Sequence, residues 1–266
     1  MTDQARPVLR GGPGGPAVVL DGLVKAFNGR LAVDHLSLQI PAGSVYGMLG
    51  PNGAGKTTSM LMVSGLMRPD AGSVQVLGHD VWSDPAGAKA LFGVSPDGLR
   101  LFDMLSAAEL LRYVGELRSM PGPVIAQRSA ELLHVLGLSE AANVVVADFS
   151  AGMTKKIGLA CAMLHAPRLL ILDEPFESVD PVSAQTMRGV IARYVAGGGT
   201  VVISSHVMEL VETVCDHVAV IVAGRVLAAG RTDDVRGGIS LHQRFLDLVG
   251  AGPAGDFDGG LAWLRS

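Results

Sequence analysis

The 266-residue sequence predicts an α/β fold built on a mostly parallel β-sheet. Apolar runs suited to buried strands recur in the second half of the chain, at Leu169–Leu172, Thr200–Ile203 and Val218–Val222. Segments suited to helices alternate with these runs, which is the pattern of parallel strands joined by helical crossovers. A glycine-rich loop at Gly50–Thr58 follows one predicted strand and opens a helix, which indicates the same class of fold.

The first part of the chain is expected to hold a flexible leader and then several short strands. Residues 1–16 are rich in glycine and proline and show no periodicity, which is typical of a leader. The strand-like segments are Ala17–Leu20, His35–Ile40, Ser44–Leu49 and Ser73–Leu77. The turn residues at 41–43 predict a hairpin-like connection between the second and third of these strands. A helix is predicted over about residues 56–66, directly after the glycine-rich loop.

A helical pattern replaces the strand pattern over about Ser106–Leu138. Apolar residues recur there at spacings of three and four, as in Leu110–Leu117. We therefore expect a helical subdomain, at about 97–165, inserted between the two strand-rich halves of the chain.

The sequence divides into a main domain at 17–235 and a short tail at 236–266. The tail begins with an amphipathic segment at 241–248, in which leucine and phenylalanine recur at helical spacing. A glycine-rich link then leads to an apolar patch at Leu261–Leu264. We find no internal repeat, so a single main domain is the expected organisation.

Composition and charge exclude several classes of function. Lys and Arg number 21 against 25 Asp and Glu, so the net charge of -4 supplies no basic excess for binding nucleic acid. No run approaches the roughly 18–20 consecutive apolar residues that a membrane-spanning helix requires. The first residues lack the apolar region of a signal peptide, and the two cysteines predict neither a disulfide framework nor a metal site. We expect a cytoplasmic protein that binds no nucleic acid.

The most specific motif lies between the predicted strand Ser44–Leu49 and the helix after it. Its residues are Gly50, Pro51, Asn52, Gly53, Ala54, Gly55, Lys56, Thr57 and Thr58, which satisfy G-x-x-x-x-G-K-[ST]. Glycines allow consecutive backbone N–H groups to surround phosphate oxygens, and the positive end of the helix dipole adds to the attraction. Lys56 is expected to reach the β- and γ-phosphates, and the Thr57 hydroxyl to coordinate Mg²⁺. The motif therefore predicts nucleotide binding.

Two further strand ends carry polar residues suited to phosphate chemistry. The apolar run at 169–172 is followed by Asp173 and Glu174. Because open α/β sheets bind ligands at the carboxyl ends of their strands, Asp173 is suited to the Mg²⁺ shell. Glu174 is suited to activating a water for attack on the γ-phosphate. His206 follows the strand at 200–203 and is expected within reach of the same phosphate, so catalysis is assigned to Glu174, His206 and Lys56.

The order of these elements resembles the nucleotide-binding subunit of an ATP-binding-cassette (ABC) transporter, a P-loop NTPase whose phosphate loop is called Walker A. Phe149–Met153 resembles the LSGGQ signature, and Asp180 resembles the aspartate of the D-loop. His206 resembles the switch histidine, and Phe27 resembles the aromatic residue that stacks on adenine. The resemblance covers about residues 17–235. It implies a mostly parallel core sheet, an antiparallel β subdomain and an inserted helical subdomain.

The resemblance also implies how the protein works. ATP and Mg²⁺ are expected at the phosphate loop, while Ser150 and Gly152 contact the γ-phosphate bound to the opposite subunit of a head-to-tail dimer. Because the chain holds a single cassette, the second ATP-binding subunit is another copy or a related cassette. Transmembrane permease subunits are expected to hold the pair peripherally at the inner face of the cell membrane. The Ser-Ala-Gly-Met signature and the short tail resemble two-component exporters of drugs, lipids or polysaccharides.

Three residues depart from the family pattern. Ala151 replaces the first signature glycine, Met153 replaces the terminal glutamine, and Asp97 replaces the glutamine of the Q-loop. Asp97 stands in a Pro-Asp-Gly sequence that is also well suited to a simple turn. A carboxylate only accepts hydrogen bonds, and Asp is one methylene shorter than Gln. Our hypothesis is that Asp97 still serves nucleotide and Mg²⁺, with its reach extended by a water.

Other functions fit the motifs less well. A soluble ABC ATPase of repair or translation usually has two cassettes or long coiled-coil insertions, and we see neither in the sequence. A GTPase would carry an N-K-x-D segment for guanine, which does not occur. A regulatory module that binds ATP with little hydrolysis stays open because of Asp97, although Glu174 and His206 argue against it.

Overall fold

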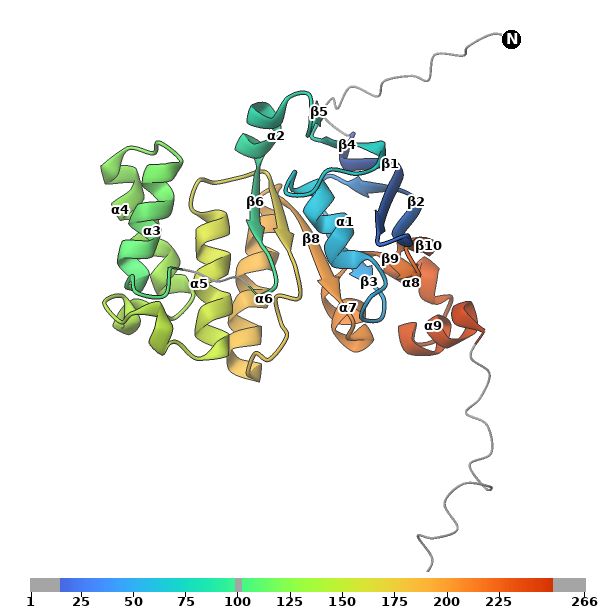
Figure 1. Ribbon diagram of the computed structural model, residues 1–266. Coiled ribbons are helices and arrows are strands. Elements are labelled where there is room, and N and C mark those ends of the chain that lie inside the picture. Colours follow the sequence, from blue (N-terminus) through green and yellow to red (C-terminus); the bar gives the residue numbers. More distant parts are fainter. Residues whose placement is uncertain (1–14, 99–101, 251–266) are drawn as a thin grey trace, which may run out of the picture.

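The computed structural model describes residues 15–98 and 102–250, which form two sheets and the helices around them (Figure 1). The smaller sheet consists of β1 (Pro16–Phe27), β2 (Arg30–Pro41), β4 (Ala71–Val76) and β5 (His79–Asp80). Its order is β2-β1-β4-β5, and its pairs are antiparallel. This sheet confirms the antiparallel β subdomain. Most of the predicted leader and the apolar patch at 261–264 lie outside the described residues.

The larger sheet is mostly parallel, as predicted. Its strands are β3 (Val45–Leu49), β6 (Phe92–Ser95), β7 (Leu169–Leu172), β8 (Thr200–Ser205), β9 (His217–Val222) and β10 (Arg225–Arg231). The order is β10-β9-β3-β8-β7-β6. β10 pairs antiparallel with β9, and the other pairs are parallel. Two of the apolar runs of the second half, β8 and β9, therefore flank β3, the strand that leads into the phosphate loop, and the third, β7, lies beyond β8.

Helices surround the two sheets. They are α1 (Lys56–Val63), α2 (Pro85–Leu91), α3 (Ala107–Leu117), α4 (Gly122–Val135), α5 (Ala151–Met163), α6 (Pro181–Ala196), α7 (Met208–Val214), α8 (Thr232–Arg236) and α9 (Leu241–Val249). Two short 3-10 helices, η1 (Ser139–Ala141) and η2 (Val146–Asp148), lie between α4 and α5. Within the described ranges, none of the helices has both the length and the apolar character needed to cross a bilayer.

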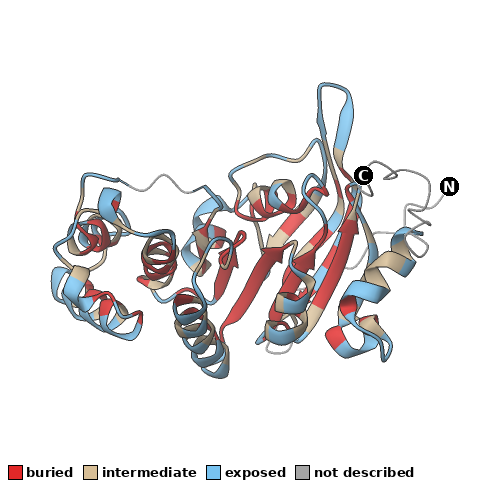
Figure 2. Ribbon diagram, turned by 90° about the horizontal axis from the view of Figure 1, so that it is seen from below, coloured by how far each residue is buried: buried red, intermediate tan, exposed pale blue. Residues whose placement is uncertain are grey.

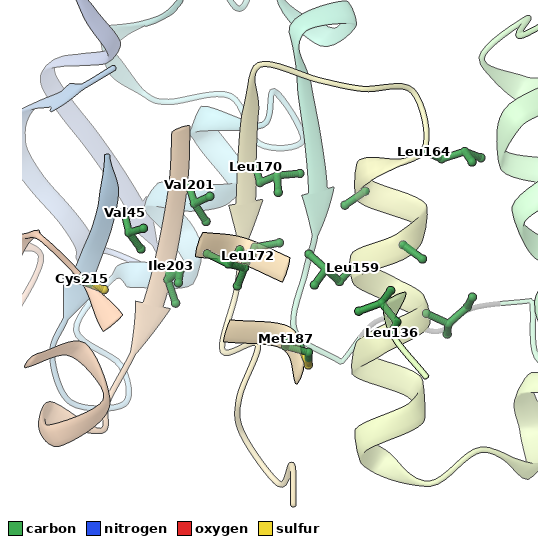
Figure 3. Packing of buried hydrophobic residues seen from close by; sticks show 14 of the residues in the cluster. Val45, Leu136, Leu159, Leu164, Leu170, Leu172, Met187, Val201, Ile203 and Cys215 are labelled. Carbon is green, nitrogen blue, oxygen red and sulfur yellow. The ribbon is translucent and has the colours of Figure 1, made fainter. Parts of the chain in front are cut away.

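Both faces of the central strands of the larger sheet, β3, β7, β8 and β9, are buried, which fits their nearly continuous apolar sequences. Side chains such as Tyr46 and Val202 point to one face and pack with residues of α1 and the smaller sheet. Their alternates, such as Leu172 and Ile203, point to the other face and pack with residues of α5, α6 and α7. Figure 3 shows Leu159 of α5 close to Leu172, and Figure 2 shows the central strands buried along their length. The two cores hold the strand ends in fixed positions.

The helices α3, α4 and α5 gather at one end of the molecule, beside β6 and α6 (Figure 1). Ser106 begins α3 with a capping box, in which its hydroxyl accepts from the Glu109 N–H (3.3 Å) and its own N–H donates to the Glu109 carboxylate (2.9 Å). Such a cap stabilises a helix by about 1 kcal/mol. At the opposite end, α9 packs on α7 and buries Leu241. The domain boundaries that we placed at 17, 97, 165 and 235 stay predictions.

The hairpin-like connection expected at residues 41–43 is wrong. β2 belongs to the smaller sheet and β3 to the larger one, so the turn carries the chain from one sheet to the other. The hairpin of this region joins β1 to β2 through Asn28 and Gly29, whose φ values of 48 and 78 degrees are both positive. Asn-Gly is the preferred pair for a tight two-residue hairpin turn. The sequence therefore contains a hairpin signal at Asn28 and Gly29, whereas our prediction placed the hairpin at residues 41–43.

Candidate nucleotide-binding site

The phosphate loop joins β3 to α1 and lies tightly against its neighbours. A Cβ atom at Gly50 would lie 2.1 Å from the carbonyl oxygen of Ile221, and one at Gly55 would lie 2.3 Å from that of Ala32. Gly55 also has a φ of 99 degrees, which glycine adopts without strain. It is the N-cap of α1, and no side chain caps that helix. The N–H groups of the first turn are thus available to an anion.

Lys56 is buried within the loop, at 5% exposure. Its Nζ donates to the carbonyl oxygens of Gly50 (2.6 Å) and Pro51 (3.2 Å). The same atom lies 3.7 Å from Glu174 Oε1. Burial lowers the pKa of Lys56, while the carboxylates of Glu174 and Asp173 act in the opposite direction. The side chain therefore sits between the loop and the buried carboxylates.

A cleft of about 430 Å³ opens over the phosphate loop. Its lining residues are Phe27, Ala32, Asn52, Gly53, Ala54, Gly55, Lys56, Thr57, Thr58, Asp97, Glu174, Glu177 and His206. The structure thus brings Phe27, Asp97, Glu174 and His206 to the predicted phosphate loop from four other segments of the chain. Gly50 and Pro51 contribute through the two carbonyl groups that bind Lys56.

Asp173 and Glu174 follow β7 and are buried, at 4% and 9% exposure. The Ser204 hydroxyl donates to Asp173 Oδ1 and accepts from the Glu174 N–H, the latter at 2.8 Å. The Asp173 N–H donates to the Ser95 carbonyl at 2.9 Å. Glu174 has a φ of 45 degrees, which is uncommon for a residue other than glycine. Contacts from β6 and β8 therefore fix the backbone that carries both carboxylates.

His206 reaches the site from the next strand. β7 and β8 pair in parallel, with Leu172 opposite Ile203, so the residues after each strand emerge at the same edge of the sheet. His206 Nδ1 lies 3.0 Å from Glu174 Oε1. Because an ionised carboxylate only accepts hydrogen bonds, this contact places the proton on Nδ1. Glu174 Oε1 is thus flanked by His206 on one side and Lys56 on the other.

Asp97 forms an ion pair at the rim of the cleft. Its Oδ1 accepts from Lys155 Nζ at 3.0 Å, and the same Nζ donates to the Glu174 carbonyl oxygen at 2.8 Å. Burial raises the pKa of Asp97, but the hydrogen bond and charge of Lys155 outweigh it, so the pKa lies below its ordinary value. The structure gives Asp97 a partner on α5 that the sequence analysis did not identify.

Ser150, Gly152 and Asp180 form a second cluster, and none of them lines the phosphate cleft. The Ser150 hydroxyl caps α5 by accepting from the Met153 N–H at 3.3 Å. A Cβ atom at Gly152 would lie 2.8 Å from Asp180 Oδ2. Asp180 caps α6 by accepting from the Ser183 N–H at 2.9 Å, which holds the pKa of Asp180 below its ordinary value. The structure brings the start of α5, which holds Ser150 and Gly152, next to Asp180, and none of the three residues lines the cleft at the phosphate loop of the same chain.

The donor set at the cleft fits a nucleotide with Mg²⁺. Among residues 15–98 and 102–250, no group of three or more His, Cys, Asp or Glu could cage a metal. None is needed, because Mg²⁺ at nucleotide sites keeps several waters and takes one or two protein oxygens together with substrate phosphates. Thr57 at the cleft and the buried Asp173 carboxylate supply oxygens of this kind, next to the Lys56 charge.

A larger groove, of about 840 Å³, lies between α4, the end of α5, and α6. Val135, Pro167 and Tyr194 are among its lining residues. The residues predicted for ATP, for Mg²⁺ and for catalysis do not line it. The chemistry of phosphate binding therefore places the site in the smaller cleft.

Three residues of the site were not assigned from the sequence. Ser204 stands two residues before His206 at the same strand end, so the argument from strand ends could have identified it. Glu177 lines the cleft three residues after Glu174. Lys155 is 58 residues from Asp97, and no local spacing connects the two. Their opposite charges are the one signal that the sequence carries for this pair.

Comparisons with known proteins agree with this geometry. Residues 33–177 match the ABC transporter family. The chain is 37% identical over 220 residues to the daunorubicin/doxorubicin resistance ATP-binding protein DrrA of Streptomyces peucetius, covering 83% of this chain and 67% of that one. It is 35% identical to the linearmycin resistance ATP-binding protein LnrL of Bacillus subtilis, covering 81% and 69%.

A solved structure of an ATP-binding subunit of an ABC transporter superposes with a TM-score of 0.81 at 27% identity, covering 88% of this chain and 99% of that one. Family match, curated relatives and structure agree with the motifs found in the cleft. The chain therefore belongs to the ABC transporter family, as an ATP-binding and ATP-hydrolysing subunit.

Proposed function

We propose that this subunit powers export through separate transmembrane permease subunits at the inner face of the cell membrane. Two of its relatives are named for resistance to daunorubicin and doxorubicin or to linearmycin. The Ser-Ala-Gly-Met form of the signature supports the same direction of transport. Co-purification with a polytopic permease that expels an apolar drug would support this assignment, and co-purification with an import system would contradict it.

The phosphate loop and its neighbours would bind ATP. Backbone N–H groups of the loop and of the first turn of α1 surround the phosphates, with the Lys56 ammonium at the β- and γ-phosphates. Phe27, at 45% exposure on the edge of the cleft, stacks on adenine. Thr57 and Asp173 hold Mg²⁺, which when bound neutralises charge on the phosphate oxygens. Asp97 lines the same cleft, where its Oδ1 accepts a hydrogen bond from Lys155 Nζ.

The arrangement of Glu174 carries the proposal for hydrolysis. Glu174 Oε1 lies beside the phosphate loop, 3.0 Å from His206 Nδ1 and 3.7 Å from Lys56 Nζ. In that position the carboxylate accepts a proton from a water as the water oxygen attacks the γ-phosphorus and the bond to the β-phosphate oxygen breaks. His206 orients the carboxylate through its N–H. Lys56 stabilises charge on the phosphates.

A second copy of the chain, or a related cassette, would complete the site. Ser150 and Gly152 lie away from the phosphate loop of their own chain, next to Asp180. The ABC family arranges two cassettes head to tail, so that the signature of one faces the phosphate loop of the other. We assign Ser150 and Gly152 to the γ-phosphate bound by the partner, and Asp180 to the same interface.

The substitution Glu174→Gln tests the catalytic role. The amide keeps the size of the side chain but cannot accept the proton, so turnover should fall roughly 100-fold or more. ATP binding should persist, and the ATP-bound dimer should become detectable by size-exclusion chromatography. Glu209→Gln removes an exposed carboxylate on α7 and serves as the control. Wild-type turnover by Glu174→Gln would remove the residue from this role, and loss of ATP binding would make its role structural.

A further inference from the structure

Lys155 connects the helical end of the molecule to the backbone of the proposed catalytic base. It lies one turn into α5, and its side chain is 20% exposed. Its Nζ bridges two oxygens from separate segments, Asp97 Oδ1 at 3.0 Å and the Glu174 carbonyl oxygen at 2.8 Å. An ammonium group has three N–H donors, so it can make both contacts at once.

The Glu174 peptide is held from both sides. Its N–H donates to the Ser204 hydroxyl at 2.8 Å, and its carbonyl accepts from Lys155 Nζ and from the Glu177 N–H at 3.2 Å. The residue needs such support because its φ of 45 degrees is unfavourable for a side chain other than glycine. Since Glu174 Oε1 lies 3.0 Å from His206 Nδ1, a small rotation of this backbone would displace the carboxylate.

Asp97 in turn holds Lys155. A lysine side chain has a flexible four-carbon stem, and placing its charge at a neutral carbonyl restricts that stem. The Asp97 carboxylate supplies an opposite charge at the same atom, in a position where the side chain of Lys155 is largely shielded from solvent. Asp97 follows β6, and Glu174 follows β7, so one ammonium group ties α5 to the ends of two neighbouring strands.

We propose that Lys155 is a positioning residue for Glu174, and that Asp97 acts on hydrolysis through Lys155. The proposal rests on the proposed role of Glu174 as the catalytic base. Lys155 binds the backbone of Glu174 and leaves its carboxylate free for the water, so it changes the placement of the base and not its chemistry. Movement of α5 relative to the strand ends would alter this placement.

The test compares Lys155→Met with Lys155→Arg in steady-state hydrolysis of Mg-ATP by the purified full chain. Methionine keeps an unbranched stem and removes the donors, so kcat should fall roughly tenfold, while KM for ATP changes less than about twofold. Arginine keeps the charge and several donors, so it should restore most of kcat. Lys89→Met removes an exposed lysine on α2 and is the matched control, with wild-type kcat expected.

Asp97→Ala is then measured in the wild-type and the Lys155→Met backgrounds. If Asp97 acts through Lys155, its loss lowers kcat in the first background and has little further effect in the second. If Asp97→Ala lowers kcat equally in both backgrounds and raises the Mg²⁺ concentration needed for hydrolysis, Asp97 does not act through Lys155. Asp97 would then be assigned to the metal. A wild-type kcat for Lys155→Met would overturn the role of Lys155 in positioning Glu174. A lowered melting temperature with an unchanged kcat per folded molecule would do the same, because it would make the role of Lys155 purely structural.

Glu174→Gln is assayed in parallel to separate the two proposals. If Glu174→Gln retains turnover, the proposed catalytic base is wrong, and the role of Lys155 falls with it. If Glu174→Gln is inactive and Lys155→Met hydrolyses ATP like the wild type, the positioning proposal alone is overturned.

Discussion

His165, just after α5, is a partly buried histidine that the catalytic site does not use. Its Nε2 lies 3.1 Å from the Phe92 carbonyl oxygen, and Nδ1 is buried without a hydrogen-bond partner among the described residues. Burial lowers the pKa of His165 to about 4, and the charges of Arg118 and Arg128 act in the same direction. The folded protein therefore keeps this imidazole neutral at mildly acidic pH.

We predict that His165 makes the folded state less stable as pH falls. An unfolded histidine titrates near 6.5, so between pH 6.5 and about 4 the unfolded chain binds a proton that the folded chain does not. The stability that depends on a neutral His165 is fully present above pH 6.5. It is lost progressively as the pH falls to about 4. Because the ring is only partly buried, the loss should be about 1–2 kcal/mol rather than the full value of the pKa shift.

Urea unfolding of His165→Gln at pH 7.5 and pH 5 checks this prediction. Glutamine can still donate to the Phe92 carbonyl and does not titrate, so the free energy of unfolding should fall less between the two pH values than in the wild type. His134→Gln removes an exposed histidine on α4 and is the control. The same pH dependence in His165→Gln as in the wild type would contradict the assignment.

At the scale of single residues, the residues that the structure brings to the cleft are those whose sequence signals are local. The phosphate loop, Asp173 and Glu174, and His206 each stand directly after a strand, and parallel strands bring such positions together. Lys155 escaped prediction because its two partners come from β6 and β7, far away in the sequence. Contacts of this kind depend on how α5 packs, which no local pattern encodes.

At the scale of elements, the junction of α5 and β6 depends on one glycine. A Cβ atom at Gly93 would lie 1.9 Å from the carbonyl oxygen of Ala162, so the helix backbone lies directly on the strand. The sequence analysis noted that residues 96–98 suit a turn and did not predict β6. β6 is an edge strand of four residues that includes a glycine, so its sequence shows too little of the alternation and β propensity by which strands are predicted. Its hydrogen-bonded pairing with β7 identifies it as a strand in the structure.

We predict that Gly93→Ala destabilises the protein by about 1–3 kcal/mol, because the backbone must move apart to admit the methyl group. Gly189→Ala is the matched control. No atom lies within 4 Å of a Cβ atom at Gly189, which is exposed within α6, so alanine there should raise stability by up to about 1 kcal/mol. Thermal unfolding followed by circular dichroism measures both, and equal stability of the two variants would contradict the close approach.

Other strands were predicted where their sequences form a clear apolar run, and were missed where they do not. β7, β8 and β9 are buried on both faces and were identified from their apolar runs. β10 alternates exposed and intermediate residues and was not predicted, because its side chains lie at the edge of the sheet. The connection at 41–43 was misplaced because a turn signal does not tell which sheet the next strand joins.

At the scale of the whole molecule, the residues predicted to contact nucleotide fall into two separate sets within one chain. The phosphate cleft holds the binding loop and Glu174, while the exposed Ser150 and Asp180 and the buried Gly152 form a cluster that does not line the cleft. Both sets of residues were predicted from the sequence. We propose that two chains bring the two sets together, as in the head-to-tail arrangement of the family.

Mixing two inactive variants tests this claim most directly. Ser150→Arg disables the signature, and Lys56→Ala disables the phosphate loop, so each homodimer should be inactive. In a heterodimer the loop of the first variant faces the signature of the second, which leaves one intact composite site. An equal mixture should therefore recover up to about a quarter of wild-type ATPase activity if subunits associate at random in a two-fold dimer. Absence of recovery, with heterodimers demonstrated by differential tagging, would contradict a site shared between chains.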